Sequence, residues 1–506
     1  MKQYCPCQVS GEVGFLCIIV AAFLAINLIT ASLSPIVWID EVMFTDPAIN
    51  LRLFGKFVSS AWFAQTDQEF WSGYPPLYPL LLSGWLWLVP ISPTGVRSLN
   101  FIIIITASVV LWLAIKRSGI IRSVSLRIVF VVLILCGNST AFSFRSGRPD
   151  AIGILIISVL VLLIVHNRSN GQLILTFMLS ALVPWAGLQL MAYVGVLGLI
   201  AAIVLRTDPR FLVCVASGVA AGAVALALFY IRAGTLDAFV ASVLPHTALG
   251  WSEHIGIFAV ARELITTDYG TLFLFPLVVI AAIMVLFKST NNRTTLIFLI
   301  LVCIIVPIAL LSIGKFPIYY FWMTFIPIST IAVLVMDQFM ARRMYSLIAG
   351  SFVCVSILIG LPTSIAVAML DREGRDYTNV EAYVKSVMTS RDIAFVDFAA
   401  YYPAKMEATR IYLEPYLKVI SESERKSVTI AILHRRETDP KSFLSTEFGG
   451  EWFSPAPDYP AERQTTGRGR CVYFSGSLSL PSFILVTSPY SIWPPRCDLK
   501  VFRRKG

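Results

Sequence analysis

The sequence predicts a polytopic α-helical membrane protein that ends in a small α/β domain outside the membrane. Hydrophobic residues make up 57% of the 506-residue chain and charged residues only 14%, whereas a soluble domain carries roughly 25% charged residues. Apolar runs of about 20 residues, the length at which a helix crosses a bilayer, recur from residue 14 to residue 368. Residues 371–506 have instead the mixed composition of a soluble domain.

Eleven apolar runs are long enough to span the membrane, and shorter apolar segments could bring the total to about 11–13 membrane helices. The first run has no small-residue cleavage site after it, so we expect it to stay in the protein. Segment 75–90 is short and rich in proline, and we interpret it as a half-spanning or surface helix. The predicted spans are residues 14–36, 96–116, 122–142, 149–166, 172–188, 190–205, 210–231, 269–288, 295–313, 316–336 and 343–368.

The distribution of basic residues predicts the orientation of these spans. If segment 75–90 does not cross, the loops on the side of the N-terminus hold twelve basic and three acidic residues. The opposite loops, up to residue 370, hold eight basic and ten acidic residues. Cytoplasmic loops carry such an excess of Lys and Arg. We therefore expect an inner- or plasma-membrane protein with a cytoplasmic N-terminus, and the net charge of +10 needs no nucleic-acid partner.

Three outer segments are long enough to carry function, namely residues 37–95, 232–268 and 371–506. Because all three lie on one side of the membrane in this topology, we expect the chemistry on that side. The prediction divides the chain into a transmembrane module, residues 1–370, and an extracytoplasmic domain, residues 371–506.

Short periodic segments predict the α/β character of residues 371–506. Asn379–Met388 has the pattern of an amphipathic helix, and Ile393–Phe398, Val428–Leu433 and Cys471–Phe474 have that of buried strands. The pattern leaves open whether Cys471 pairs with Cys497.

Two adjacent carboxylates, Asp40 and Glu41, follow the first span and are the main catalytic candidates. Charged groups at a bilayer boundary are costly unless they face water, a metal or a reacting group. A carboxylate there can act as a general base, with the second assisting it or holding a cation; alternatively, the pair only marks a helix end. Asp46 and Pro47 predict the start of the next helix, with Asp46 as its N-cap.

The segment FRSGRPDAIGIL places Arg145, Arg148 and Asp150 at the outer end of a predicted span. Two guanidinium groups suit a phosphate or pyrophosphate, and Asp150 can orient one of them or bind a metal. The alternative is a salt bridge that caps two helices.

A later segment, GKFPIYYFWMTFIP, places Lys315 at the outer surface beside Tyr319 and Tyr320. This lysine is a candidate ligand for a headgroup phosphate, or else an interfacial side chain that reaches toward water. His246 and His254 lie in the second long outer segment as candidates for metal binding or as polar loop residues. The sequence identifies no cofactor, and a divalent cation stays an open alternative.

The sequence also lacks several signatures. It contains no Walker A motif, no G-x-S-x-G, no H-E-x-x-H and no dinucleotide-binding glycine motif. The predicted spans carry almost no charge, which disfavours a pump or an ion-coupled transporter.

The order of the motifs resembles that of the GT-C superfamily of polyprenyl-phosphate-dependent glycosyltransferases. The bacterial branch with protein O-mannosyltransferases and the aminoarabinose transferase of lipid A is the most similar in pattern. The shared order is an Asp-Glu pair, the helix start YPPLY at 74–78, an Arg-x-Asp element and a late Lys-x-Pro-x-Tyr-Tyr motif. The resemblance covers most of residues 14–370.

The resemblance implies roles for single residues. Asp40 matches the family's catalytic acid, and Glu41 matches the carboxylate that often follows it. Tyr74 stands where relatives commonly carry a charged residue or histidine. The remaining residues of the two later motifs are Arg148, Asp150, Lys315, Tyr319 and Tyr320.

The resemblance further implies inverting transfer of a sugar, a hexose or pentose, from a polyprenyl-phosphate donor. The acceptor would be a lipid, a glycan or a protein at the outer face of the cell envelope. Asp40 would deprotonate the acceptor, and Arg and Lys side chains would neutralise the phosphate leaving group.

Two alternatives remain. A non-enzymatic lipid or solute carrier, such as a flippase or exporter, would explain the many spans but not the long loops on one side. An O-antigen ligase or polymerase would use a late outer loop rich in Arg and His, whereas residues 232–268 hold only Arg232 and Arg262 as arginines.

Overall fold

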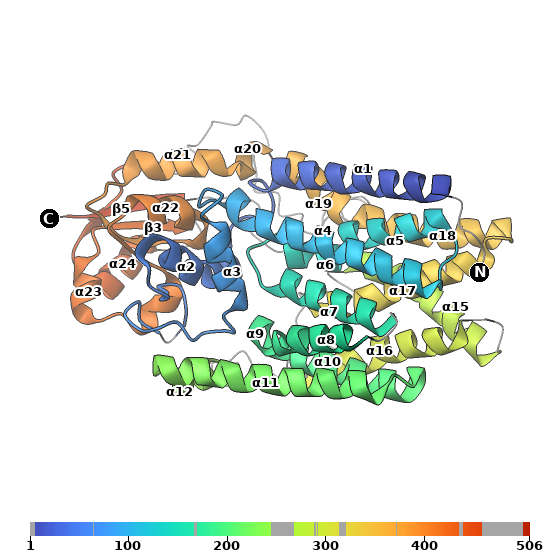
Figure 1. The fold of residues 1–506 in the computed structure, drawn as a ribbon. Coiled ribbons are helices and arrows are strands. Elements are labelled where there is room, and N and C mark those ends of the chain that lie inside the picture. Colours follow the sequence, from blue (N-terminus) through green and yellow to red (C-terminus); the bar gives the residue numbers. More distant parts are fainter. Residues whose placement is uncertain are drawn as a thin grey trace.

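The computed structural model describes residues 6–63, 65–165, 169–243, 268–287, 290, 292–312, 320–370, 372–434, 439–457 and 499–505. Figure 1 shows a long helical bundle, with a small sheet and its helices packed against one end of the bundle. Helix α1 begins near the opposite end, and strand β5 closes the chain inside the sheet-bearing part (Figure 1).

The described part of the bundle contains helices that match all eleven predicted spans. Seven are long and apolar enough to cross a membrane, one further span is a helix pair bent by 54°, and three apolar helices are shorter. The long ones are α1 (Pro6–Thr30), α4 (Pro93–Ser118), α10 (Leu188–Ile200) with the π-helix η1 (Ala201–Leu205), α11 (Pro209–Ala233), α16 (Arg293–Ser312), α17 (Trp322–Phe339) and α18 (Arg343–Ile359) with the start of α19 (Leu361–Leu370). The bent pair is α5 (Val124–Cys136) and α6 (Asn138–Phe144). The shorter ones are α7 (Asp150–Val165), α8 (Asn170–Ala181) with α9 (Val183–Ala186), and α14 (Tyr269–Leu272) with α15 (Phe275–Leu286).

Helix α4 shows why these boundaries are where they are. The Ser92 hydroxyl accepts a hydrogen bond from the Gly95 amide, and Pro93 occupies the first turn, where its missing N–H costs nothing. Gly119 ends the helix with a φ of 66°, a conformation that suits glycine. Within its apolar 18-residue window, 61% of the residues are buried in the bundle, so α4 is a central helix.

Two shorter helices lie where the bundle meets the sheet (Figure 1). Helix α2 runs over Ile39–Phe54, so the prediction that Asp46 caps a helix starting at Pro47 is wrong. The helix begins one residue after Trp38 and continues through Pro47, which leaves Asp46 in its middle. Helix α3 (Leu77–Trp85) has nine residues, about 13.5 Å at 1.5 Å per residue, and therefore fits the half-spanning or surface helix expected from sequence.

The C-terminal part is a five-stranded sheet with helices, as the sequence predicted. The strand order is β2-β1-β3-β5-β4; β1 is parallel to β2 and β3, whereas β5 is antiparallel to β3 and β4. Its elements are α20 (Arg372–Arg375), α21 (Tyr377–Val387), β1 (Ile393–Val396), α22 (Tyr401–Glu407), β2 (Arg410–Tyr412), α23 (Glu422–Ser427), β3 (Ile430–His434), α24 (Pro440–Phe448), β4 (Trp452–Phe453) and β5 (Leu499–Arg504). The predicted strand Cys471–Phe474 and both cysteines, Cys471 and Cys497, lie outside the described residues.

The hydrophobic core is continuous between the two parts. One cluster of buried side chains includes Val42 and Ile49 of α2 and also Tyr401, Tyr402 and Val396 of the sheet-bearing part. Because apolar contacts of this kind are the main stabilising term in packing, the C-terminal part is docked firmly on α2.

Candidate functional site

The site is organised around one arginine that binds two carboxylates. Arg148 precedes α7, and its Nη1 atom forms an ion pair with Oδ2 of Asp40 in the first turn of α2. Its Nε atom lies 2.9 Å from Oδ2 of Asp150. The rings of Trp38 and Phe44 lie 5.7 Å and 5.4 Å from the guanidinium carbon. The structure thus joins Asp40 to Arg148, 108 residues away in the chain.

Of these three charged side chains, Asp40 is the one that reaches solvent. Its side chain is 25% exposed, against 3% for Arg148 and 1% for Asp150. Desolvation raises the pKa of Asp40 above its ordinary value, and the Arg148 guanidinium opposes this only in part. A carboxylate that is accessible and has a raised pKa is suited to accept a proton.

The backbone around Arg148 is held by close packing against α2 and α4. Nδ2 of Asn100, on α4, donates to the carbonyls of Ser146 and Arg148 at 2.7 Å and 2.9 Å. A Cβ atom at Gly147 would lie 2.6 Å from Cγ2 of Thr45, so only glycine lets this loop approach α2. The position of Arg148 is therefore set by its surroundings.

Glu41 points away from solvent and pairs with a different arginine. Nη2 of Arg97 lies 2.6 Å from Oε2, and Nε of Arg97 lies 3.2 Å from Oε1. The hydroxyl of Tyr402 donates to Oε1 at 3.0 Å. Both members of the ion pair are fully buried. Since successive residues of a helix point about 100° apart, the adjacent acids Asp40 and Glu41 have different surroundings.

Asp46 is a second buried acid of α2, although the sequence pattern predicted it as the N-cap of a helix. Its Oδ1 accepts from Tyr401 at 2.5 Å and lies 2.9 Å from Nζ of Lys405. Its Oδ2 accepts from Ser59 Oγ at 2.8 Å and from the Ser60 amide at 2.7 Å. Desolvation acts to raise the pKa of Asp46, but Lys405 and these hydrogen bonds outweigh it and leave the pKa below its ordinary value.

Arg145 is fully buried against the end of α1. Its Nη1 donates to Oδ1 of Asn27 at 2.6 Å, and its Nη2 donates to the carbonyls of Thr30 and Ser34 at 3.1 Å and 2.7 Å. These carbonyls at a helix C-terminus suit a cation. Arg145 therefore bonds to α1, whereas Arg148 bonds to the two aspartates.

Tyr74 lies beside the Asp40–Arg148–Asp150 group. Its ring contacts that of Phe44 at 5.0 Å, and its hydroxyl bonds to Gln189 on α10 at 2.9 Å. The hydroxyl is also hydrogen-bonded to Tyr320 and feels the charge of Asp150. Tyr320, the described residue of the late motif, is thus brought into the same group.

Lys315, Tyr319 and His246 lie outside the described residues. Within the described ranges, no group of three or more His, Cys, Asp or Glu side chains could hold a metal ion. Asp40 and Asp150 are both bonded to Arg148, so the described carboxylates do not form a ready cation site.

Sequence reasoning missed several residues of this network. Arg97 could have been found, because a charged residue in the first turn of an apolar span is costly without a partner. Tyr401, Tyr402, Lys405 and Gln189 carry no local signal, since each acts through a partner far away in the chain.

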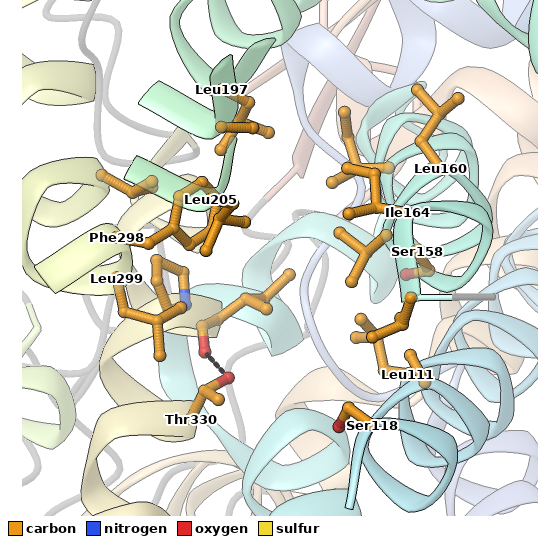
Figure 2. A pocket seen from close by; sticks show the side chains of 18 of the residues that line it. Leu111, Ser118, Ser158, Leu160, Ile164, Leu197, Leu205, Phe298, Leu299 and Thr330 are labelled. Atoms are coloured by element: carbon orange, nitrogen blue, oxygen red, sulfur yellow. Dashed lines mark hydrogen bonds between the residues drawn. The ribbon is translucent and has the colours of Figure 1, made fainter. Parts of the chain in front are cut away.

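A separate apolar cavity of about 270 Å³ lies inside the bundle. It is lined by the second halves of α4 and α7, while Arg97, Asn100 and Asp150 lie in the first halves of these helices. Figure 2 shows apolar side chains that converge on it, among them Leu111, Leu160, Ile164, Leu197, Phe298 and Leu299. The cavity is therefore distinct from the charged group near α2.

Comparisons with known proteins identify the fold. No family model matches the chain, and no curated protein sequence matches it. The structure is similar to that of ArnT from Cupriavidus metallidurans bound to undecaprenyl phosphate, with a TM-score of 0.54 at 11% identity over 88% of this chain and 96% of that chain. The apo state of the same ArnT gives a TM-score of 0.53 at 12% identity, with the same coverage of both chains. The chain therefore shares the fold of ArnT, which is the kind of fold that the resemblance implied.

Proposed function

We propose that this chain is an inverting glycosyltransferase that moves a sugar from a polyprenyl-phosphate donor to an acceptor at the outer face of the membrane. The observation that carries the proposal is Asp40, an accessible carboxylate with a raised pKa, held by Arg148 on a helix that is otherwise fixed by buried acids. The GT-C fold supports the general kind of reaction.

In this mechanism Asp40 accepts the proton of the acceptor hydroxyl or amine while the acceptor atom attacks the anomeric carbon. The bond between that carbon and the phosphate oxygen breaks, and polyprenyl phosphate leaves with the electron pair. A single displacement inverts the anomeric centre. Protonation of Asp40 weakens its ion pair with Arg148 as the leaving group becomes more negative, so the guanidinium can bind the phosphate while Asp150 still orients it.

The other predicted residues enter the proposal to different degrees. Lys315 is retained as a second phosphate ligand. Tyr320 and Tyr74 contribute hydroxyl groups beside Arg148 and Asp150. Arg145 is assigned to holding α1, in view of its contacts there. His246 stays a candidate for acceptor or metal binding. Residues 1–370 would form the catalytic module and residues 371–506 the extracytoplasmic domain.

The topology that follows from the charge distribution can be measured directly. Cysteine labelling or reporter fusions should place residues 118–122 and 288–293 in the cytoplasm and residues 232–268 and 371–506 outside it, because basic loops stay inside. A cytoplasmic reporter signal from a fusion at Gly506 would contradict both this topology and an extracytoplasmic reaction.

The function itself is tested by comparing cells with and without this chain. Mass spectrometry of lipids, glycans and surface proteins should show a sugar that is lost on deletion and restored by the wild-type chain but not by Asp40→Asn. A carrier would instead act without Asp40, so restoration by both chains would favour the flippase or exporter alternative. An unchanged profile in all fractions would remove the proposal.

Arg148→Met and Lys315→Met should each lower the affinity for the donor strongly, while the folded fraction of the protein changes little. A hydrogen bond to a charged group contributes about 1.5–3 kcal/mol, which corresponds to roughly 10- to 100-fold in donor affinity. Arg148→Lys should not fully restore it, because an ammonium lacks the paired N–H groups of a guanidinium. The measurement is donor affinity of the purified variants, with the half-exposed Arg52→Met as the matched control.

A double variant of Arg148 and Asp150 separates two roles of the arginine. If Arg148 serves only to cap α7 through Asp150, the double variant Arg148→Met with Asp150→Asn should lose less donor affinity than either single variant. Unchanged donor affinity in both Arg148→Met and Lys315→Met would remove these residues from the phosphate site.

A further inference from the structure

Helix α22 of the C-terminal part forms hydrogen bonds and an ion pair with two buried acids of α2. The hydroxyl of Tyr402 donates to Oε1 of Glu41 at 3.0 Å, and that of Tyr401 donates to Oδ1 of Asp46 at 2.5 Å. Nζ of Lys405 lies 2.9 Å from the same oxygen of Asp46. The helix of seven residues thus contacts α2 at two points that are five residues apart.

Each of these acids also bonds to a segment before α22 in the chain, and Glu41 joins α22 to the bundle through α4. Glu41 is held by both Nε and Nη2 of Arg97, from α4, and Asp46 is held by Ser59 and Ser60, from the loop after α2. All of these side chains are buried. Charge-assisted hydrogen bonds are stronger and more directional than neutral ones, particularly away from water. Glu41 therefore links α2 to both the bundle and α22, and Asp46 links it to both its own following loop and α22.

The position of Asp40 depends on this arrangement. It is the residue next to Glu41 in the first turn of α2, and the cation that it contacts is Arg148, which precedes α7 and does not belong to α22. A shift of α2 would therefore change the distance between Asp40 and Arg148. A displacement of about 1 Å can lower the rate of a reaction by roughly 10²-fold.

We propose that the C-terminal part acts in sugar transfer by positioning Asp40, and that Tyr402, Tyr401 and Lys405 are the positioning residues. This inference rests on the proposed function and assigns to the C-terminal part a role in the rate of the chemical step. None of the three residues touches a reacting atom in it; each acts through α2.

A second contact makes the inference testable without undocking the C-terminal part. Asp67, in the loop between α2 and α3, receives hydrogen bonds from Nε and Nη2 of Arg410 at 2.9 Å and 2.6 Å and from the Tyr416 hydroxyl at 3.0 Å. Together with the continuous apolar core, this contact remains when one hydroxyl of α22 is removed.

The first test is Tyr402→Phe in the full-length chain, assayed with a polyprenyl-phosphate sugar. We expect kcat per folded molecule to fall about 10- to 100-fold, with the KM for the donor within about twofold of wild type. Tyr383→Phe is the matched control, since its hydroxyl donates to the carbonyl of Pro457 within the C-terminal part at 3.0 Å. It should leave kcat unchanged.

The pH profile distinguishes positioning from stability. Asp40 faces Arg148, and Asp150 lies behind that arginine. If α2 shifts, the pair of Asp40 and Arg148 weakens and the arginine lowers the pKa of Asp40 less. The acidic limb of the pH profile of kcat should then move to higher pH in Tyr402→Phe. A loss of stability alone would reduce the folded fraction and leave the limb in place.

Tyr401→Phe provides a second variant at the other contact. We expect the same combination of lower kcat, unchanged donor KM and a shifted acidic limb, which would support the inference. Wild-type kcat and an unmoved limb in both variants would overturn it while the proposed function stands. Absence of transfer by the wild-type chain, or full transfer by Asp40→Asn, would instead overturn the proposed function and this inference with it.

Discussion

Asp40→Asn should abolish sugar transfer while folding and donor binding stay near wild type. The amide has almost the same shape as the carboxylate but cannot accept the acceptor's proton. Loss of a positioned base typically lowers the rate by about 10²–10⁴-fold. Because the Asp40 side chain is 25% exposed, replacing its charge should cost less stability than a change at the buried acids of the same helix.

The measurement is kcat of the purified variant with a polyprenyl-phosphate sugar, alongside donor affinity and thermal unfolding. Asp237→Asn, on helix α12 (Leu236–Val243), is the matched control because it makes the same change away from the α2 network. The pKa of Asp40 is raised, so wild-type activity should fall as the pH drops through a value above about 3.9, the ordinary pKa of an aspartate. Full activity of Asp40→Asn would remove Asp40 as the base.

Arg97→Met should strongly destabilise the protein. It leaves Glu41 fully buried and without its cation, and breaking a buried ion pair on one side typically costs about 3–5 kcal/mol. It also removes the bond between Arg97 and the carbonyl of Ala31, at the end of α1. The measurement is the unfolding temperature in detergent, with the exposed Arg210→Met as a control that should change stability by no more than about 0.5 kcal/mol.

A double-mutant cycle shows whether the loss comes from the unpaired charge. Arg97→Met together with Glu41→Gln removes both charges, so it should be more stable than Arg97→Met alone. If the two variants unfold at the same temperature, the effect of Arg97 comes from its packing and its bond to Ala31, and not from its pairing with Glu41.

The membrane spans were predictable because the bilayer imposes a simple rule. A helix needs about 20 apolar residues to cross, and every predicted span coincides with a helix or a helix pair. The strands Ile393–Phe398 and Val428–Leu433 were predicted for a similar reason, since both are central and apolar. Strands β2 and β4 have three and two residues, too few to show an alternating pattern, and they were missed.

The catalytic candidates were found by residue type and motif order, but their surroundings were not. The sequence grouped Asp40 with Glu41 and Arg145 with Arg148, as neighbours along the chain. The structure separates both pairs: Asp40 and Arg148 bind each other, Glu41 binds Arg97, and Arg145 binds the end of α1. Neighbours in sequence point in different directions from a helix or turn, so their partners depend on packing.

The sequence by itself determined the place of the apolar helices, the α/β nature of the C-terminal part and the region that holds the acids. These properties follow from local composition and periodicity. Only the tertiary structure decided which acid reaches solvent, and that α22, some 355 residues after Asp46, holds the helix of Asp40. That outcome depends on burial and on hydrogen bonds between distant segments, and a local sequence pattern predicts neither of them.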